Sequence, residues 1–248
     1  MNETIQTLLN HQSIRKYRHE PIPETHLSLI LSAAQRASTS SNMQAYSVVR
    51  VTDAVLREQF ATLSGNQRYV AECSEFLVWC ADLYKLELAC QIHGDTTVPT
   101  TMEHLLVATI DVALAAQNAA VAAESLGYGI VYIGGIRNDP FTAATLLALP
   151  PKTFPVFGMC IGFPAQDAAA PARPRLPLTG FVHTNQYGPA QVGQSIETYD
   201  EMIKQYMITR TGGAQTKTWS EDVEAKMKAN ARRHMKALLH QQGFEITE

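Results

Sequence analysis

The sequence predicts an α+β protein in which a small, mostly antiparallel central sheet is flanked by helices. Strand patterns are few and short, whereas helical patterns are long and numerous. In chain order they run helix, helix, strand, helix, strand, helix, strand, strand, helix, helix, which does not alternate as a doubly wound parallel sheet requires. No repeat or clear linker interrupts the 248 residues. We therefore predict a single domain, 1–248, with a C-terminal helical excursion around 196–248.

The N-terminal half contains three helix patterns and two strand patterns. Asn2 can cap a first helix whose apolar face is Ile5, Leu8 and Leu9. Prolines at 21 and 23 then break the chain. The expected elements after this break are a helix with Leu27, Ile30, Leu31 and Ala34 on one face, a polar loop at 38–42, a strand at 47–52, a helix at 54–63 that stops at Gly65, and a strand at 76–81.

The C-terminal half begins with a long helix expected from near Thr101 to Gly127. Its apolar stretch is rich in alanine but contains Asp111, Gln117 and Glu124, so a buried central helix is favoured over a membrane span. The expected elements after it are strands at 130–133 and 156–162, an extended connection at 165–177, and helices at 196–209 and 220–241 joined by 210–218, with Ser220 as an N-cap and Gly243 at the end.

Composition and missing motifs exclude several classes of function. A net charge of −3 and a pI near 6.2 argue against a nucleic-acid partner, and no signal segment is apparent, so we expect a cytoplasmic protein without a membrane partner. The four cysteines form no C-x-x-C pair and are expected to be reduced and mostly buried. The scattered histidines predict no metal site. Neither common nucleotide-binding glycine motif occurs.

Two clusters of polar and cationic residues are candidates for an anion site. His11, Ser13 and Arg15 stand at alternate positions, so their side chains would share one side of an extended segment. Arg173 and Arg175 have the same spacing, stiffened by the proline between them. Arginine forks suit phosphate oxygens. The clusters either meet at one phosphate or remain two solvated patches, and composition alone leaves both readings open.

Two further segments could approach a flat ligand. Gly134 and Gly135 follow a strand pattern, which favours a tight turn but also allows close approach of the backbone to a ligand. Gln67, in a polar segment at 65–69, offers the donor and acceptor needed to read the edge of a heterocycle. A plain surface turn is an equally good reading of that segment.

Six short stretches are common individually but specific in their order and spacing: NHQSIR at 10–15, STSSNMQ at 38–44, GNQRY at 65–69, AAESLG at 122–127, VYIGGIRN at 131–138 and RPRLP at 173–177. Through them, nearly the whole chain resembles the nitroreductase and flavin reductase family. The nearest branch is that of the oxygen-insensitive NADPH nitroreductases and NADPH-FMN oxidoreductases. The resemblance implies a nitroreductase-like fold and an intertwined homodimer with one non-covalent FMN at each interface.

The resemblance also implies a role for each site residue. The phosphate of FMN would be held by His11, Ser13, Arg173 and Arg175, and the pyrimidine edge would face Arg15 and Gln67, with Tyr69 close by. The remaining flavin-binding residues would be Gln12 and Ile14, the other subunit's Thr39, Ser40 and Ser41, and Tyr132, Ile133, Gly134 and Gly135 beside the ring. No side chain would act as a catalytic acid, base or nucleophile, because FMN itself carries the chemistry.

The implied activity is two-electron, ping-pong transfer from NADPH to small acceptors such as nitroaromatics, quinones or free flavin. Arg210 would contact the 2′-phosphate of NADPH. Gln215 and Thr216 stand between Arg210 and Lys217 where relatives have a basic loop, so NADH use is possible. Gln12 replaces an arginine common in relatives, and Arg173 replaces a lysine. The alternative is a flavin-binding carrier or regulatory protein without turnover.

Overall fold

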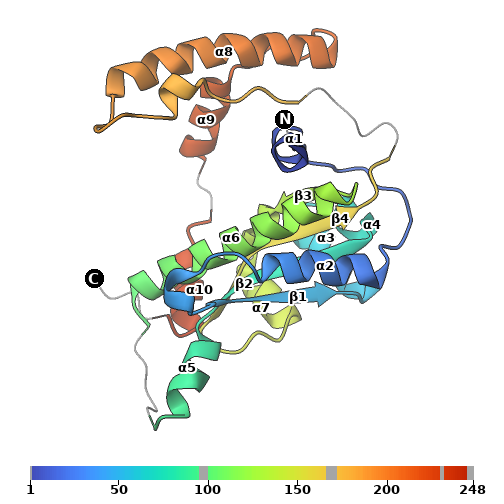
Figure 1. Ribbon diagram of the computed structural model, residues 1–248, viewed down its shortest axis with the longest axis vertical. Coiled ribbons are helices and arrows are strands. Elements are labelled where there is room, and N and C mark those ends of the chain that lie inside the picture. The colour runs from blue at the N-terminus through green and yellow to red at the C-terminus, as the bar shows by residue number, and fades with distance from the viewer. Residues whose placement is uncertain (1, 95–99, 166–171, 230–231, 245–248) are drawn as a thin grey trace. The chain divides into compact units, whose positions relative to one another are not determined.

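The computed structural model describes residues 2–94, 100–165, 172–229 and 232–244. The chain divides into two compact units (Figure 1). The first comprises Met1–Ala169 and Arg232–Glu248, and the second is Ala170–Ala231. The predicted single domain with a C-terminal excursion stays a prediction.

A four-stranded antiparallel sheet lies at the centre of the first unit. The strands β1 (Tyr46–Val51), β2 (Glu75–Asp82), β3 (Gly129–Ile133) and β4 (Thr153–Gly162) are arranged in the order β1-β2-β4-β3. All three pairings are antiparallel, and the β2–β4 register shifts between Trp79 and Cys80, as at a β-bulge. The predicted fold class and all four predicted strands are therefore confirmed.

Helices cover both faces of this sheet (Figure 1). On β2, Leu77 and Trp79 belong to the core that includes α2 (Glu24–Ala34) and α6 (Met102–Ser125). The alternate residues Phe76 and Val78 belong to a second core with α3 (Ala54–Leu63). Because both faces of β2 are buried, its sequence does not alternate between apolar and polar residues. This explains why residues 76–81 form a continuous apolar run.

The long predicted helix is confirmed as α6. By length and composition it could cross a membrane, but it is a core helix. It begins with a capping box between Thr101 and His104. Its buried face is largely alanine, which allows close helix packing, and consists of Ala108, Asp111, Val112, Ala115, Ala116, Ala119, Ala120 and Ala123.

Three short helices in the first unit were not predicted. They are α4 (Tyr69–Glu72), α5 (Tyr84–Gln91) and α7 (Pro140–Leu146). A single turn such as α4 is too short to show a periodic pattern. A start signal was available for α7, because Asp139 accepts a hydrogen bond from Thr142 N–H and Pro140 occupies the first turn.

The predicted first helix is confirmed as α1 (Glu3–Leu9), with Asn2 Oδ1 accepting from Ile5 N–H at 3.0 Å. Its apolar residues are not part of the core. The exposed fraction is 45% for Ile5, 44% for Leu8 and 64% for Leu9, so this apolar face is uncovered within one chain.

The second unit consists of η4 (Leu178–Gly180), α8 (Pro189–Thr211) and α9 (Trp219–Lys228). The helix predicted at 196–209 begins earlier than expected, where Pro189 fits its first turn. Residues 166–171 of the predicted extended connection lie outside the described residues.

The predicted helix at 220–241 is wrong as a single element. It divides into α9 in the second unit and α10 (Met235–Gln241) in the first, and residues 230–231 lie outside the described residues. Its predicted N-cap is also wrong. Thr218 caps α9 through a capping box with Glu221, while Ser220 N–H donates to Asp200 at 2.8 Å. Gly243 follows the end of α10 with a positive φ of 79°, as expected.

Candidate functional site

The segment containing His11, Ser13 and Arg15 lies along the edge of β3. Ser13 forms a parallel bridge with Ile130, and Ile14 N–H donates to Ile130 O at 2.9 Å. The extended conformation expected for this segment is present at that bridge. Ile14 is buried, whereas Ser13 and Arg15 are exposed. The alternation therefore leaves their hydroxyl and guanidinium groups accessible to a ligand.

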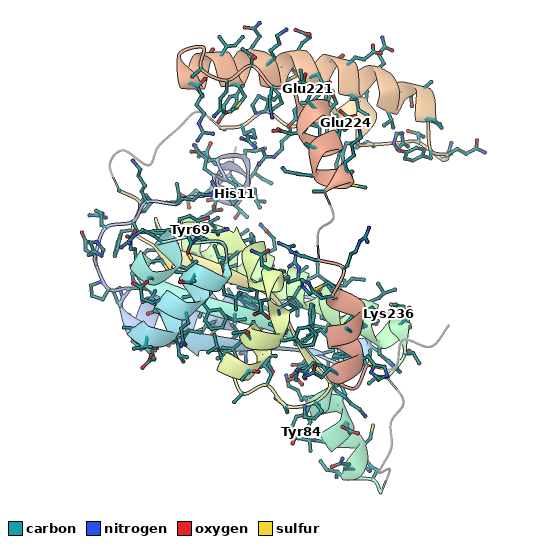
Figure 2. All side chains as sticks on the ribbon, turned by 180° about the vertical axis from the view of Figure 1, so that it is seen from behind. His11, Tyr69, Tyr84, Glu221, Glu224 and Lys236 are labelled. Carbon is teal, nitrogen blue, oxygen red and sulfur yellow. The ribbon has the colours of Figure 1, made fainter. Side chains whose placement is uncertain are left out.

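His11 is held by a carboxylate of the core helix. It follows directly after α1 (Figure 2), and its Nδ1 lies 2.6 Å from Glu124 Oε1 on α6. Because a carboxylate only accepts, Nδ1–H is the donor. This pairing fixes the orientation of the ring and leaves Nε2 as the group that can face a ligand. Sequence reasoning missed the role of Glu124.

Gly129 allows this segment to approach β3. A Cβ at Gly129 would lie 2.5 Å from Ile14 Cγ1 and 2.7 Å from Ile14 Cβ. Neither atom is the flexible end of a long side chain, so a larger residue would displace the segment. Gly129 was predicted to lie just before a strand, but nothing in the sequence pattern showed its contact with Ile14.

The polar loop at 38–42 is attached to α6 by a buried carboxylate. Within it, Ser40–Asn42 forms the short 3-10 helix η1, in which Ser41 has a positive φ of 48°. Asp111 Oδ1 accepts from Ser40 N–H at 3.1 Å, and Oδ2 accepts from Ala45 N–H at 3.2 Å. Thr39, Ser40 and Ser41 are thus positioned by Asp111, a residue not included in the predicted site.

Gln67 and Tyr69 act as a pair. The Tyr69 hydroxyl donates to Gln67 Oε1 at 2.7 Å, and Gln67 N–H donates to Ala61 O at 2.9 Å. Tyr69, labelled in Figure 2, begins α4. With its oxygen engaged, the Gln67 amide keeps its NH₂ group available as a donor. The recognition role of Gln67 stays a prediction.

The glycine pair opens a 3-10 helix after β3, η2 (Gly134–Asn138). A Cβ at Gly135 would lie 2.5 Å from Ser64 O, so this glycine is required by packing against the end of α3. Gly134 is partly exposed. Just before them, Ile133 is buried and the Tyr132 hydroxyl donates to Gln117 Oε1 at 3.2 Å. The turn reading is therefore correct, and Gly134 is the position open to a ligand.

Two of the predicted cationic residues of the second unit, Arg173 and Arg210, lie beside one aromatic ring. The guanidinium of Arg173 lies 6.0 Å from the Tyr206 ring centroid, and that of Arg210 lies 5.9 Å from it. Tyr199 donates to Pro174 O at 2.8 Å, which ties the Arg173–Arg175 segment to α8. Tyr206 and Tyr199 were missed because aromatic residues at helical spacing look like core positions.

The predicted site residues thus form separate groups. A hollow of about 470 Å³ is lined by Gln12, Ile14, Glu124 and Gly129 but not by Gln67 or Gly134. Arg173, Arg175 and Arg210 belong to the second unit, whereas the other predicted residues belong to the first. The meeting of the two groups at one ligand stays a prediction.

Nearly the whole chain is similar to known proteins. A model of the nitroreductase family matches residues 8–163, and a model of the nitroreductase family C-terminal domain matches residues 173–247. An oxygen-insensitive NADPH nitroreductase of Salmonella typhimurium is 39% identical, covering 98% of this chain and 99% of the relative. A Bacillus subtilis FMN reductase (NADPH) is 38% identical over the same shares. The structure of B. megaterium NfrA2 is 36% identical, covers 100% of both chains and has a TM-score of 0.96.

Proposed function

The chain belongs to the nitroreductase family, and we propose that it is an oxidoreductase that binds FMN and takes electrons from NADPH. The observation that carries the proposal is the full-length match to relatives named NADPH nitroreductase and FMN reductase. The chemistry of the ordered side chains gives it independent support.

The donors available in the first unit fit a flavin. Flavin presents carbonyl and ring-nitrogen acceptors along its pyrimidine edge. The NH₂ group of Gln67, oriented by Tyr69, is a donor of the required kind. Arg15 is an exposed cation at the edge of β3. His11 is oriented by Glu124, so that its Nε2 would face a phosphate oxygen.

When bound, FMN would supply the two-electron chemistry. The chain's own residues would bind it and stabilise charge. The guanidinium of Arg15 would favour the negative charge that develops at the pyrimidine edge on reduction. Gly134, without a side chain, would leave one side of the ring accessible. Donor and acceptor would then use that side in turn, which gives a ping-pong cycle with nitroaromatics, quinones or free flavin as acceptors.

We place the phosphate groups on the arginines of the second unit. Arg173 and Arg175 would hold the phosphate of FMN, and Arg210 would contact the 2′-phosphate of NADPH. Arg210 Nη1 donates to the Tyr206 hydroxyl at 3.3 Å, which limits its freedom before binding. Arg210 would still make NADPH the preferred donor, but Gln215 and Thr216 leave the loop less basic, so NADH would also be used, more slowly.

The active form we propose is a homodimer. Along α6, an exposed apolar stripe recurs at every fourth residue, with exposed fractions between 42% and 56% for Met102, Leu106, Ile110 and Leu114. Together with the exposed apolar face of α1, it would be covered by the partner. Thr39, Ser40 and Ser41 would line the partner's flavin. All four cysteines are free, which fits a cytoplasmic location.

The first prediction concerns turnover. An anaerobic absorbance spectrum of the purified protein should show bound flavin that NADPH bleaches at once and NADH bleaches slowly. Adding a quinone should restore the oxidised spectrum. A flavin that NADPH leaves oxidised would instead support the carrier alternative, and a colourless protein that takes up no FMN would contradict the proposal.

The second prediction separates the two phosphate assignments. Arg175→Gln should weaken FMN binding by about 10- to 100-fold, because a charge-assisted hydrogen bond contributes about 1.5–3 kcal/mol. Riboflavin, which has no phosphate, should bind the variant and the parent equally. The matched variant Arg210→Gln should keep its FMN affinity but raise the KM for NADPH and not that for NADH. Equal losses for FMN and riboflavin would contradict the role of Arg175.

A further inference from the structure

Tyr132 lies on β3 between two parts of the candidate site. It stands two residues after Ile130, which Ser13 bridges, and two residues before Gly134, which begins η2. Side chains two residues apart on a strand share one face of the sheet, so Tyr132 lies on the Ile130 side, against the core that includes α6. The position of the Tyr132 ring therefore affects the surroundings of a ligand that contacts both parts.

Two contacts hold the Tyr132 side chain. Its hydroxyl donates to Gln117 Oε1 at 3.2 Å. Its ring lies edge-on to the ring of Phe157 on β4, with a centroid distance of 5.1 Å and an interplanar angle of 86°. Burial raises the pKa of Tyr132 well above its usual value, so the hydroxyl stays protonated and acts as a hydrogen-bond donor. Phe157 thus supports the ring, and Gln117 fixes its polar end.

Gln117 belongs to the side of α6 that also supports His11. It precedes Glu124 by seven residues, which is about two helical turns, so the two side chains leave α6 on nearly the same side. Glu124 contacts His11 at 2.6 Å, and Gln117 contacts Tyr132. One side of a single helix therefore reaches the segment after α1 through Glu124 and the end of β3 through Gln117.

Gln117 is exposed, so its truncation opens no cavity in the core. It lines a hollow of about 810 Å³ whose other walls come mainly from α1 and α6. Substitution of an exposed residue usually changes the stability of a fold only slightly. The main consequence of the Gln117–Tyr132 hydrogen bond is therefore the orientation of the Tyr132 ring.

We propose that Gln117 is a positioning residue of the reductase site, which holds the Tyr132 hydroxyl and thereby fixes the tilt of the Tyr132 ring beside bound FMN. This inference rests on the proposed function, because it requires FMN at the end of β3. Gln117 acts through Tyr132. It therefore alters the rate at which the flavin is reduced and leaves unchanged the affinity for NADPH, which we assign to Arg210.

The test follows the reduction of FMN-loaded protein by NADPH in an anaerobic stopped-flow experiment. Gln117→Ala should lower the limiting rate constant by about 2- to 10-fold, the factor that corresponds to one net hydrogen bond. The NADPH concentration that gives half of this rate should stay at the parent value. Gln59→Ala is the matched control, because it truncates another exposed helical glutamine, on α3, and should be reduced at the parent rate.

A second variant tests whether Gln117 acts through Tyr132. Tyr132→Phe removes only the hydroxyl and should slow reduction by the same factor as Gln117→Ala. If the hydrogen bond between them is the cause, the double variant should be no slower than either single variant. Losses that add in the double variant would overturn the proposal, because each side chain would then act independently.

A measurement without turnover separates positioning from a general loss of structure. The visible circular dichroism of bound FMN reports the asymmetric surroundings of the flavin ring. It should change in the same way in Gln117→Ala and Tyr132→Phe, while the urea midpoint stays near that of the parent. A Gln117→Ala protein with the dichroism and reduction rate of the parent would overturn the proposal. If NADPH does not reduce the parent, the proposed function fails instead, and the dichroism of the oxidised flavin still tests the role of Gln117.

Discussion

Replacing Asp111 with alanine is expected to destabilise the protein by about 3 kcal/mol, because a buried backbone donor at Ala45 and a part-buried one at Ser40 lose their acceptor. Asp111 is 1% exposed, and its two oxygens accept from Ser40 N–H and Ala45 N–H at 3.1 and 3.2 Å. Neither donor can turn to another partner, since both are fixed by the loop that leads into β1. The measurement is urea unfolding at one fixed protein concentration, so that any oligomer contributes equally.

Two matched variants separate this role from a general effect of lost charge. Asp111→Asn keeps the shape and one acceptor oxygen but directs an amide donor at the second N–H, so we expect an intermediate loss. Asp53→Ala removes an exposed carboxylate that caps α3 by accepting from Leu56 N–H at 2.8 Å, and should cost about 1 kcal/mol. An Asp111→Ala variant as stable as Asp53→Ala would contradict the assignment.

The Asp111 substitution also bears on the site. Ser41, Asn42 and Gln44 have positive φ angles of 48°, 58° and 52°. Residues other than glycine adopt such angles at a cost, which their surroundings must offset. The carboxylate is the anchor that holds Ser40 and Ala45 on either side of this run. Its loss should free Thr39, Ser40 and Ser41 even in molecules that remain folded.

Asp111 also shows what a sequence can predict here and what it cannot. A carboxylate within an alanine-rich apolar helix argues against a membrane span, and this reasoning needs only composition. A buried carboxylate must also have partners. The identity of those partners was not predictable, because Ser40 and Ala45 are about 70 residues away in sequence and donate backbone N–H groups, which every residue type except proline possesses.

The strands and the helices with long apolar patterns were predictable because each follows from local periodicity. The division of 220–241 was not, since Trp219–Lys228 and Met235–Gln241 both have helical composition. The break shows only in the backbone, where Ala229 is extended and Arg232 has a φ of 60°. The capping residue Thr218 was within reach, because Thr218 and Glu221 have capping-box spacing.

The residues of the candidate site also fall into those that the sequence could predict and those that it could not. The residues named from the sequence carry the groups that would face a ligand, and their types reveal the chemistry. The residues that position them contact them across long stretches of chain: Glu124 contacts His11, Asp111 contacts Ser40, and Tyr206 contacts Arg173. Such supporting contacts depend on the tertiary fold, and no local pattern encodes them.

Gly129→Ala is expected to weaken FMN binding by about 5- to 150-fold while the protein remains folded. The added Cβ would lie 2.5 Å from Ile14 Cγ1, closer than packed atoms tolerate. Overpacking of this kind costs about 1–3 kcal/mol, and about 1.4 kcal/mol corresponds to a tenfold change in affinity. The segment with His11, Ser13 and Arg15 is attached here through Ile14 N–H, so relief of the clash should move those three side chains. Fluorescence titration with FMN measures the effect.

A second substitution, at Ile14, tests whether the clash with this side chain causes the loss of FMN affinity in Gly129→Ala. Ile14→Gly removes the atoms that the new methyl group would meet, at the cost of a buried side chain. If the clash with Ile14 is responsible, Ile14→Gly should lower the FMN affinity of the Gly129→Ala protein less than it lowers that of the parent. The double-mutant cycle would then show a favourable coupling between the two positions.

The control must be a glycine that can accept a Cβ. Gly127→Ala is unsuitable, because the φ of 84° at Gly127 strains any larger residue. Gly193→Ala, with open space around its Cβ, should leave FMN affinity unchanged. Additive losses at Ile14 and Gly129 would mean that their contact does not position the segment.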